Sequence, residues 1–374
     1  MLGSSSDGNW AISFLLTTHS VLYLRCKNFM QTFFMTMSKA MLFIFGWPSA
    51  LGGADTKLAH LIPLLTEHFD ITLVPNENRH LHSKVWTKYL DKFRIKYTTL
   101  ENLPAKVTGI GLALCNHQFF TKRIAHRAAE RGLRIIWSSE MMWHHEGELE
   151  AIRTGIVSKV LYVSESQRAT LQPGYGNLCS RLTGNYIDSD WFPFKERRNE
   201  CFTIGRLSRP DPLKYPEDFP VFYERLDLPE ARFRVMAWDD KLAHKYRWHR
   251  FDHHWDLLKA EKESQVEFLY SLDLFVYPLG HRFRESWGRS TVEAMLTGCI
   301  PLVPAGHNFE NLLLHGKTGF ICKDFLEYKE AARELCLEWP KRQSMARACR
   351  EHAETKLCNK QEHLKLWLEA LRIP

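Results

Sequence analysis

The chain has 374 residues, which is more than one ordinary hydrophobic core holds and a comfortable length for two domains. Its 45% hydrophobic and 25% charged residues are typical of globular proteins, so the composition excludes a disordered or fibrous chain. The net charge of +7 suits a protein that handles phosphorylated ligands or contacts an anionic membrane surface, although many other proteins carry as much.

Residues 1–36 are predicted to be a leader outside the globular fold. The apolar stretch Trp10–Leu24 is interrupted by four polar residues at 17–20, which suits neither a bilayer span of about 20 apolar residues nor a secretory signal. The functional chain is expected to begin near Met35 or Met37. A leader that associates with a membrane is the alternative.

After the leader, the pattern is that of a βαβ unit. Residues 40–46 form a short apolar run ended by glycine and proline, as expected of a strand buried on both faces of a parallel sheet. A loop with Gly52-Gly53 follows, and the apolar residues from Leu58 to Leu65 then recur at i, i+3, i+4 and i+7, which predicts a helix. Ile71–Val74 supplies the next strand, reached by a right-handed crossover.

The same alternation continues and then restarts after residues 183–194. Two runs of strands and helices predict two Rossmann-like domains, at 37–190 and 191–355. A last helix, within 356–374, is expected to pack back on the first domain through Leu364, Trp367, Leu368 and Leu371. The other predicted strands are Gly111–Cys115, Ile135–Ser138, Val160–Val163, Cys201–Ile204, Phe233–Ala237, Leu274–Tyr277 and Ile300–Val303, with a basic helix at Thr121–Arg131 and a helical or extended piece at Val266–Tyr270.

Residues 284–295, Arg-Glu-Ser-Trp-Gly-Arg-Ser-Thr-Val-Glu-Ala-Met, are the most informative stretch. Glu285 and Glu293 flank a turn at Gly288 that opens a predicted helix, Arg289–Thr297. Backbone N–H groups at a helix start bind anions, so a diphosphate can lie there. Glu293 could accept hydrogen bonds from ribose hydroxyls and Glu285 from sugar hydroxyls. The alternative is a solvated helix with ordinary capping acids.

A second stretch, residues 204–214, leaves the first strand of the second domain at the carboxyl edge, where open α/β sheets bind ligands. Arg206 offers a forked set of donors and Lys214 a point charge, which together can neutralise a departing diphosphate. Arg209 is a third candidate cation. Taken singly, these residues are equally consistent with isolated surface bases.

Together the two stretches resemble the retaining glycosyltransferases of family 4, which have the GT-B fold of two Rossmann-like domains facing across a donor-binding cleft. Glu285 and Glu293 match the E-x7-E element of that family, and Gly205-Arg206-Leu207 matches the start of its second domain. Further matches in chain order are Gly52-Gly53, Val163-Ser164-Glu165, Thr183-Gly184-Asn185-Tyr186-Ile187-Asp188 and Gly316-Lys317-Thr318-Gly319-Phe320.

The resemblance implies transfer of a sugar from a nucleotide-sugar donor, with retention of anomeric configuration and without a metal. Arg206 and Lys214 would bind the donor diphosphate, Glu293 the ribose and Glu285 the transferred sugar. Gly53 would let the first-domain loop approach the phosphates, because a side chain there would block it. The rest of the sugar–phosphate cradle would come from Trp287, Gly288, Arg289, Ser290 and Thr291.

The sequence departs from the family pattern at three places. Lys214 comes eight positions after Arg206, where relatives have five, so either a longer loop still brings it to the phosphate or Arg209 takes over; we expect the first. Glu140 stands where relatives often have a histidine near the reacting sugar. It could orient the acceptor or the sugar, or accept a proton, unless it belongs to an exposed aromatic-rich loop. Tyr186 replaces a glycine in the linker.

His144 is a second candidate near the reacting sugar, and Trp238 could stack on the nucleobase, with core packing as the alternative. Four histidines (His244, His249, His253 and His254) cluster without the spacing of a zinc site, and we expect no metal there. The basic segment Lys122–Arg134 could contact anionic lipid, phosphorylated glycan or nucleic acid, but a solvated helix face is the simpler interpretation, and no nucleic-acid-binding motif is present.

The sequence therefore predicts a retaining glycosyltransferase, with a UDP- or GDP-sugar as donor and a glycan, lipid-linked or other hydroxyl compound as acceptor. Nine scattered cysteines without a C-x-x-C pair indicate a reducing compartment, so a cytoplasmic enzyme is expected, with peripheral contact with the inner face of the membrane as an alternative. The alternatives are a GT-B sugar-nucleotide epimerase or hydrolase and an inactive protein that binds nucleotide sugars or glycans.

Overall fold

The computed structural model describes residues 39–49, 53–114, 116, 118–228 and 230–372. The predicted leader, Gly52 and Cys115 lie outside the described residues. Within these ranges, no helix combines the length and the apolar character needed to cross a membrane. The seven cysteines of the described ranges are all free thiols.

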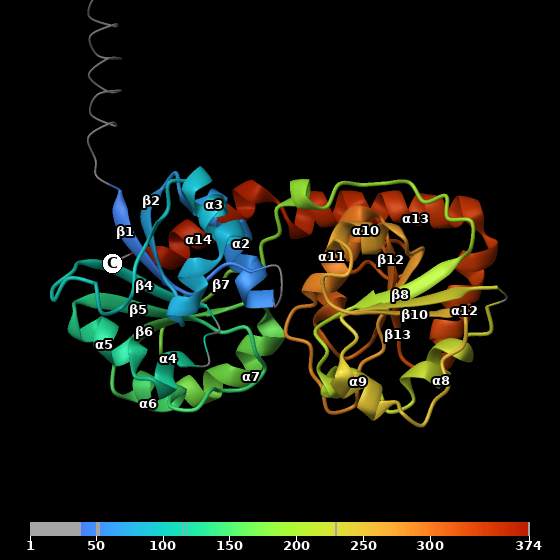
Figure 1. Ribbon diagram of the computed structural model, residues 1–374, viewed down its shortest axis with the longest axis horizontal. Coiled ribbons are helices and arrows are strands. Elements are labelled where there is room, and N and C mark those ends of the chain that lie inside the picture. Colours follow the sequence, from blue (N-terminus) through green and yellow to red (C-terminus); the bar gives the residue numbers. More distant parts are fainter. Residues whose placement is uncertain (1–38, 50–52, 115, 117, 229, 373–374) are drawn as a thin grey trace, which may run out of the picture. The chain divides into compact units, whose positions relative to one another are not determined.

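The first domain is built on a seven-stranded sheet with the order β3-β2-β1-β4-β5-β6-β7, and its described strand registers are parallel. Helices alternate with the strands, as the βαβ pattern predicts (Figure 1). The strands are β1 (Ala40–Phe45), β2 (Phe69–Val74), β3 (Lys96–Tyr97), β4 (Gly109–Leu114), β5 (Leu133–Ser138), β6 (Val157–Tyr162) and β7 (Ser180–Leu182). The helices are α2 (Gly53–Leu65), α3 (Lys84–Lys92), α4 (Gln118–Thr121), α5 (Ile124–Glu130), α6 (Glu148–Arg153) and α7 (Glu165–Tyr175).

The second domain has a six-stranded sheet with the order β10-β9-β8-β11-β12-β13, also with parallel pairs. Its strands are β8 (Thr203–Leu207), β9 (Arg232–Met236), β10 (Trp255–Leu258), β11 (Leu274–Val276), β12 (Ile300–Pro304) and β13 (Phe320–Cys322). The helices are α8 (Phe219–Glu224), α9 (Asp240–Lys245), α10 (Gln265–Tyr270), α11 (Arg289–Thr297), α12 (Phe325–Leu337) and α13 (Trp339–His352). The predicted pair of Rossmann-like α/β domains is thus confirmed, and the exact domain limits stay a prediction.

The apolar run at the start of the first domain is explained by burial on both faces of β1. Leu42 and Ile44 belong to the core cluster shared with α2, whereas Phe43 and Phe45 belong to the cluster on the other side. Because successive strand residues point to opposite faces, a strand covered on both sides needs apolar residues at every position.

One predicted element differs from the structure. The single basic helix expected at Thr121–Arg131 is divided into α4 and α5, because Arg123 has a left-handed backbone conformation (φ 53°). The turn at Arg123 redirects the chain so that Ala125 and Ala128 of α5 are buried together with Phe119 and Phe120. In the second domain, the piece at 266–270, predicted to be either helical or extended, is the helix α10.

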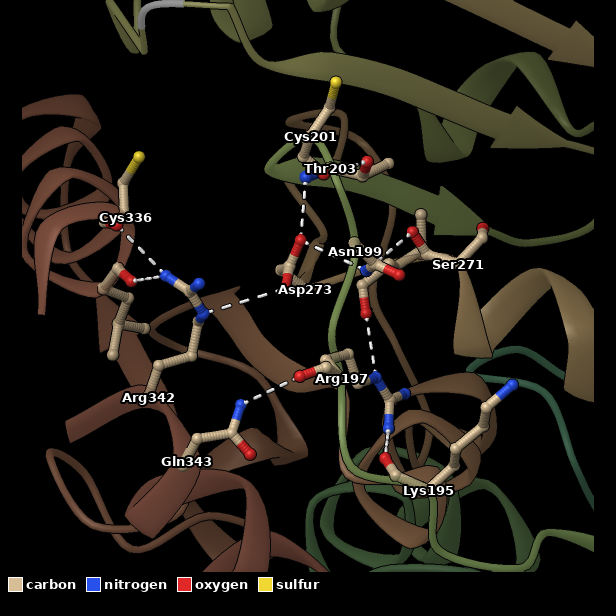
Figure 2. A network of polar contacts seen from close by, with 12 residues as sticks. Lys195, Arg197, Asn199, Cys201, Thr203, Ser271, Asp273, Cys336, Arg342 and Gln343 are labelled. Atoms are coloured by element: carbon tan, nitrogen blue, oxygen red, sulfur yellow. Dashed lines mark hydrogen bonds and ion pairs between the residues drawn. The ribbon is translucent and has the colours of Figure 1, made fainter. Parts of the chain in front are cut away.

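The segment that joins the two sheets is fixed to the second domain by buried polar contacts (Figure 2). Arg197 donates to the backbone oxygens of Leu269 (2.9 Å) and Leu272 (3.1 Å), and its burial lowers its pKa. Asp273 accepts a hydrogen bond from the Thr203 amide at 2.9 Å, at the first residue of β8. These contacts fix where β8 begins.

The chain finishes in α14 (Lys360–Leu371), which follows the π-helix Ala353–Leu357 and packs on the first domain. Trp367 and Leu371 are buried in the same cluster as the apolar face of α2. The Lys159 ammonium donates to the backbone oxygen of Ala370 at 2.6 Å, which ties α14 to β6. In Figure 1 the red α14 accordingly lies among the blue and green elements of the first sheet.

Candidate functional site

A cavity of about 1040 Å³ is lined by residues of both domains. The first domain contributes the start of α2 and the loop after β5, and the second contributes the loop after β8, the loop after β10 and the segment that opens α11. These loops follow the carboxyl ends of parallel strands, where α/β folds commonly bind ligands. The volume is at the upper end of the range of small-molecule sites.

The segment that opens α11 forms one side of the cavity. Gly288 is the residue before the helix and has φ 103°, and a β-carbon there would lie 2.7 Å from Phe309 Cε1. A glycine is therefore required both for the backbone conformation and for the space. Trp287, Gly288 and Ser290, which the sequence predicts to be in the donor cradle, line the cavity. Thr291 does not: it is fully buried beneath the helix start.

Lys214 and Glu285 meet in this cavity. The Lys214 ammonium lies 3.2 Å from Glu285 Oε2, and the Tyr277 hydroxyl donates to the same oxygen at 3.1 Å. Burial is the largest single effect and lowers the pKa of Lys214, but the charge and hydrogen bond of Glu285 together with Tyr277 outweigh it, so the pKa of Lys214 is raised. Lys214 therefore stays a cation, although most of its surface is removed from water.

The two arginines after β8 have different positions from those predicted. Arg206 does not line the cavity: it is completely buried, and its guanidinium lies 3.8 Å from the Tyr215 ring centre and 4.3 Å from that of Tyr277. It donates to the Pro278 backbone oxygen at 2.8 Å. Arg209 lines the cavity instead, five positions before Lys214. The expectation that Arg206 contacts the ligand directly is therefore corrected: Arg209 and Lys214 are the accessible pair.

Glu293 and Arg289 form an ion pair one helical turn apart, with 2.8 Å between Arg289 Nε and Glu293 Oε1. Gln265 also donates to Glu293, and all three residues line the cavity. Burial raises the pKa of Glu293, against the opposing effect of Arg289. Arg289 further donates to Asn185 Oδ1 at 2.8 Å. The Arg289–Glu293 ion pair is therefore connected to the linker between the domains.

On the side of the first domain, Glu140 lines the cavity and is 2.7 Å from the Lys57 ammonium of α2. Lys57 is completely buried and does not itself reach the cavity. His144, the alternative candidate, faces away: its Nε2 contacts the Leu171 backbone oxygen at 3.1 Å, and its ring packs against Tyr175. Of the two candidates, only Glu140 is therefore placed to contact a ligand.

Gly53 opens α2 and lines the cavity, together with Asp55 and Thr56 of the first turn of that helix. Sequence reasoning did not find Asp55 or Thr56. Their position directly after the glycine loop was the available signal, because residues in the first turn of a helix that begins at a site face the same space as the loop. Burial raises the pKa of Asp55 to about 6, while the nearby Arg209 charge acts in the opposite direction.

Trp238 does not face the cavity, which corrects the expectation that it stacks on a nucleobase. Its ring stacks on Tyr246 at 5.7 Å between centroids and meets Phe251 edge-on at 5.4 Å, within the core of the second domain. The neighbouring residues Met236 and Ala237 line the cavity instead. β9 ends at Met236, and Ala237 has a left-handed backbone conformation (φ 69°), so the chain turns between the strand and Trp238.

The histidine-rich region lies away from the cavity. His249 pairs with Glu224 at 2.9 Å, and His244 contacts Arg247, so these two do not converge with the others. Across the described ranges, the single group with metal-binding spacing is Asp252, His253 and His254, and it lies at the protein surface.

Comparison with known proteins supports a relation between this chain and one enzyme family. Residues 230–354, within the second domain, match the family model described as glycosyl transferases group 1. No protein among the curated sequences matches the chain.

Solved structures resemble almost the whole chain. HepE from Anabaena, solved with UDP and glucose, has 14% identity and a TM-score of 0.68, covering 89% of this chain and 99% of its own. Sucrose-phosphate synthase from Thermosynechococcus elongatus has 11% identity and a TM-score of 0.64, covering 88% and 98%. The lipopolysaccharide outer core galactosyltransferase WaaB has 12% identity and a TM-score of 0.59, with the same coverage. At these identities the likeness shows the fold, which is GT-B as predicted.

Proposed function

We propose that this chain, whose second domain matches the group 1 glycosyltransferases, transfers a sugar from a nucleotide-sugar donor to a hydroxyl acceptor with retention of anomeric configuration. The observation that carries the proposal is the cavity, where Arg209, Lys214 and the start of α11 surround a space also lined by Glu285 and Glu293. Cations and a helix start bind a diphosphate, and carboxylates accept hydrogen bonds from the hydroxyls of the sugar and the ribose.

The mechanism follows from where negative charge develops. As the bond between the sugar and the β-phosphate breaks, charge grows on the phosphate oxygens, and fixed positive groups stabilise that state more than the ground state. Lys214 is held for this role by Glu285 and Tyr277 rather than being free to move. These cations and the helix start take the part that a divalent metal would otherwise play, so we expect the reaction to need no metal.

A UDP-sugar is the proposed donor. HepE, which shares the fold, was solved with UDP and with UDP-glucose, and this supports uridine over the guanosine alternative. Arg209 and Lys214 would bind the diphosphate, Glu293 the ribose and Glu285 the transferred sugar. Arg206 would act behind them, by fixing the loop that carries Lys214: it donates to the Lys214 backbone oxygen at 3.4 Å.

The test is donor binding followed by product analysis. Calorimetric titration with UDP, GDP and ADP should show tightest binding of UDP, and Lys214→Met should weaken it at least tenfold, because a hydrogen bond to a charged group contributes about 1.5–3 kcal/mol. NMR of the product should show the anomeric configuration of the donor, with the same rate in EDTA. UDP release at an equal rate with and without acceptor would identify a hydrolase, and absence of binding to any nucleotide would overturn the proposal.

A further inference from the structure

The two walls of the cavity differ in charge. The lysine and arginine residues that line it, Arg209, Lys214, Arg284 and Arg289, all belong to the second domain, which also contributes Glu261, Glu263, Glu285 and Glu293. Among the described residues, the first domain contributes no lysine or arginine to the lining but does contribute two carboxylates, Asp55 and Glu140.

The carboxylate of Asp55 is available to a ligand. Within the described residues it forms neither an ion pair nor a side-chain hydrogen bond, whereas Glu140 is already paired with Lys57. Asp55 is in the first turn of α2, partly buried, with the Arg209 charge acting on it from the opposite wall. A carboxylate with lone pairs directed into a cavity accepts hydrogen bonds and has none to donate.

The same wall has an apolar and aromatic part. Met141, Met142 and Trp143 line the cavity directly after Glu140, and Trp143 is 47% exposed. An exposed indole ring beside carboxylates suits a sugar ring, because the C–H groups of one sugar face pack on the negative face of the indole, while hydroxyls at the ring edge reach acceptor oxygens.

We propose that the acceptor is a neutral sugar that binds to this first-domain wall, with Trp143 against its ring and Asp55 accepting a hydrogen bond from a hydroxyl. This inference rests on the proposed function, in which the donor occupies the second-domain wall. A phosphorylated or carboxylated acceptor would meet two carboxylates and no cation on this wall, which disfavours it electrostatically.

In the transfer step, the bond between the anomeric carbon and the β-phosphate oxygen breaks, and a bond from that carbon to the acceptor oxygen forms. The hydroxyl proton passes to the departing diphosphate, and the products are the glycoside and UDP. Asp55 is assigned to hold the acceptor and takes no proton in this step.

The experiment compares neutral and anionic acceptors with the full chain. UDP release from UDP-glucose, UDP-galactose and UDP-N-acetylglucosamine is measured with methyl glycosides, with disaccharides, and with the corresponding 6-phosphates and uronic acids. We expect kcat/KM to be at least tenfold higher for a neutral acceptor than for its anionic counterpart.

Asp55→Asn should raise the acceptor KM at least tenfold and leave the Kd for UDP within twofold, and Trp143→Ala should also raise the acceptor KM. Asp91→Asn, an exposed acid of α3, is the matched control and should change neither quantity. Thermal unfolding confirms that each variant is folded.

The possible failures are distinguishable. Preference for an anionic acceptor, or transfer to no neutral sugar, by a protein that binds UDP overturns this inference and leaves the donor site standing. An unchanged acceptor KM in Asp55→Asn also overturns it. A protein that binds no nucleotide overturns the proposed function itself.

Discussion

Arg206 and Arg209 are three residues apart, yet their environments are opposite. Arg206 lies between two tyrosine rings with its donors directed at protein oxygens, whereas Arg209 lines the cavity. Removing a buried arginine leaves its acceptors unsatisfied, while removing an exposed one mainly removes contacts with a ligand. The two side chains therefore have separable roles in stability and in binding.

We expect Arg209→Met to weaken UDP binding about 10- to 100-fold, the effect of losing one charge-assisted hydrogen bond, with little change in Tm. Arg206→Met should lower the Tm by several degrees, because the Pro278 carbonyl and the Ser208 hydroxyl lose their donor. Calorimetric titration and thermal unfolding of both variants measure these effects. A variant at Arg206 with a normal Tm and no UDP affinity would show that this arginine reaches the diphosphate after all.

The raised pKa of Asp55 predicts that the stability of the folded protein depends on pH. Burial raises its folded pKa to about 6, above the ordinary value of 3.8, so the folded protein binds more protons than the unfolded chain between these values. Stability therefore falls as pH rises through this window, and the loss is complete above pH 6. The ionised carboxylate is thus a cost to the fold at neutral pH.

Asp55→Asn, which carries no charge, should be more stable than the wild type at pH 7, by about 1–2 kcal/mol after allowance for solvent contact. The two proteins should converge near pH 4, where Asp55 is protonated in the wild type. Thermal unfolding of both proteins from pH 4 to pH 8 measures the difference. A stability difference between the two proteins that does not vary with pH would contradict the raised pKa of Asp55.

At the scale of one element, the start of α11 needs a special backbone conformation, packs against the core and lines the cavity. Gly288 has φ 103°, and its α-carbon faces the Phe309 ring, so the turn before the helix is possible only without a side chain. The residues on either side of it, Trp287 and Arg289, both line the cavity. A change at this glycine must therefore move groups that face the ligand.

Gly288→Ala should lower stability by about 1–3 kcal/mol and weaken UDP binding, because the first turn of α11 has to shift away from Phe309. Gly316→Ala is the matched control: φ is 72° there, and nothing lies within 4 Å of the added carbon. The control should lose about 1–2 kcal/mol from its backbone conformation and bind UDP normally. Equal UDP affinities in the two variants would show that the start of α11 is not part of the donor site.

At the scale of the whole molecule, residues distant in the chain support the cavity together. Ser164 Oγ of the first domain donates to the Ser286 backbone oxygen of the second at 2.6 Å, beside the segment that opens α11. The Trp367 ring of α14 lies 5.2 Å from the Lys57 ammonium, whose partner Glu140 lines the cavity. The last helix therefore supports the first-domain wall without touching the ligand.

Trp367→Ala should cost about 3–5 kcal/mol, as is usual for removing a fully buried tryptophan, and should also reduce transfer activity through Lys57 and Glu140. Leu366→Ala, on the same helix but 39% exposed, should cost less than about 1 kcal/mol and leave activity unchanged. Denaturant unfolding and the UDP-release assay measure both. Full stability in Trp367→Ala would contradict the packing of α14 described above.

The sequence by itself determined the class of the fold and the order of most strands, although it did not predict β3, β7, β10 or β13. The apolar runs of β1 and β12, the periodicity of α2 and the glycines that bound α11 are local features, so each element could be predicted from its own residues. The Gly288 turn between two glutamates likewise identified the segment that precedes α11 and lines the cavity.

Only the tertiary structure decided which side chains face the cavity. Arg206, Thr291 and Trp238 are buried behind it, whereas Arg209 and Asp55 line it, although all five stand near the predicted loops. A residue beside a strand end points either to the ligand or to the core, and segments far away in the chain decide which. Tyr277, for example, packs against Arg206 and belongs to a distant strand end. The periodicity of a short segment contains no information about those partners.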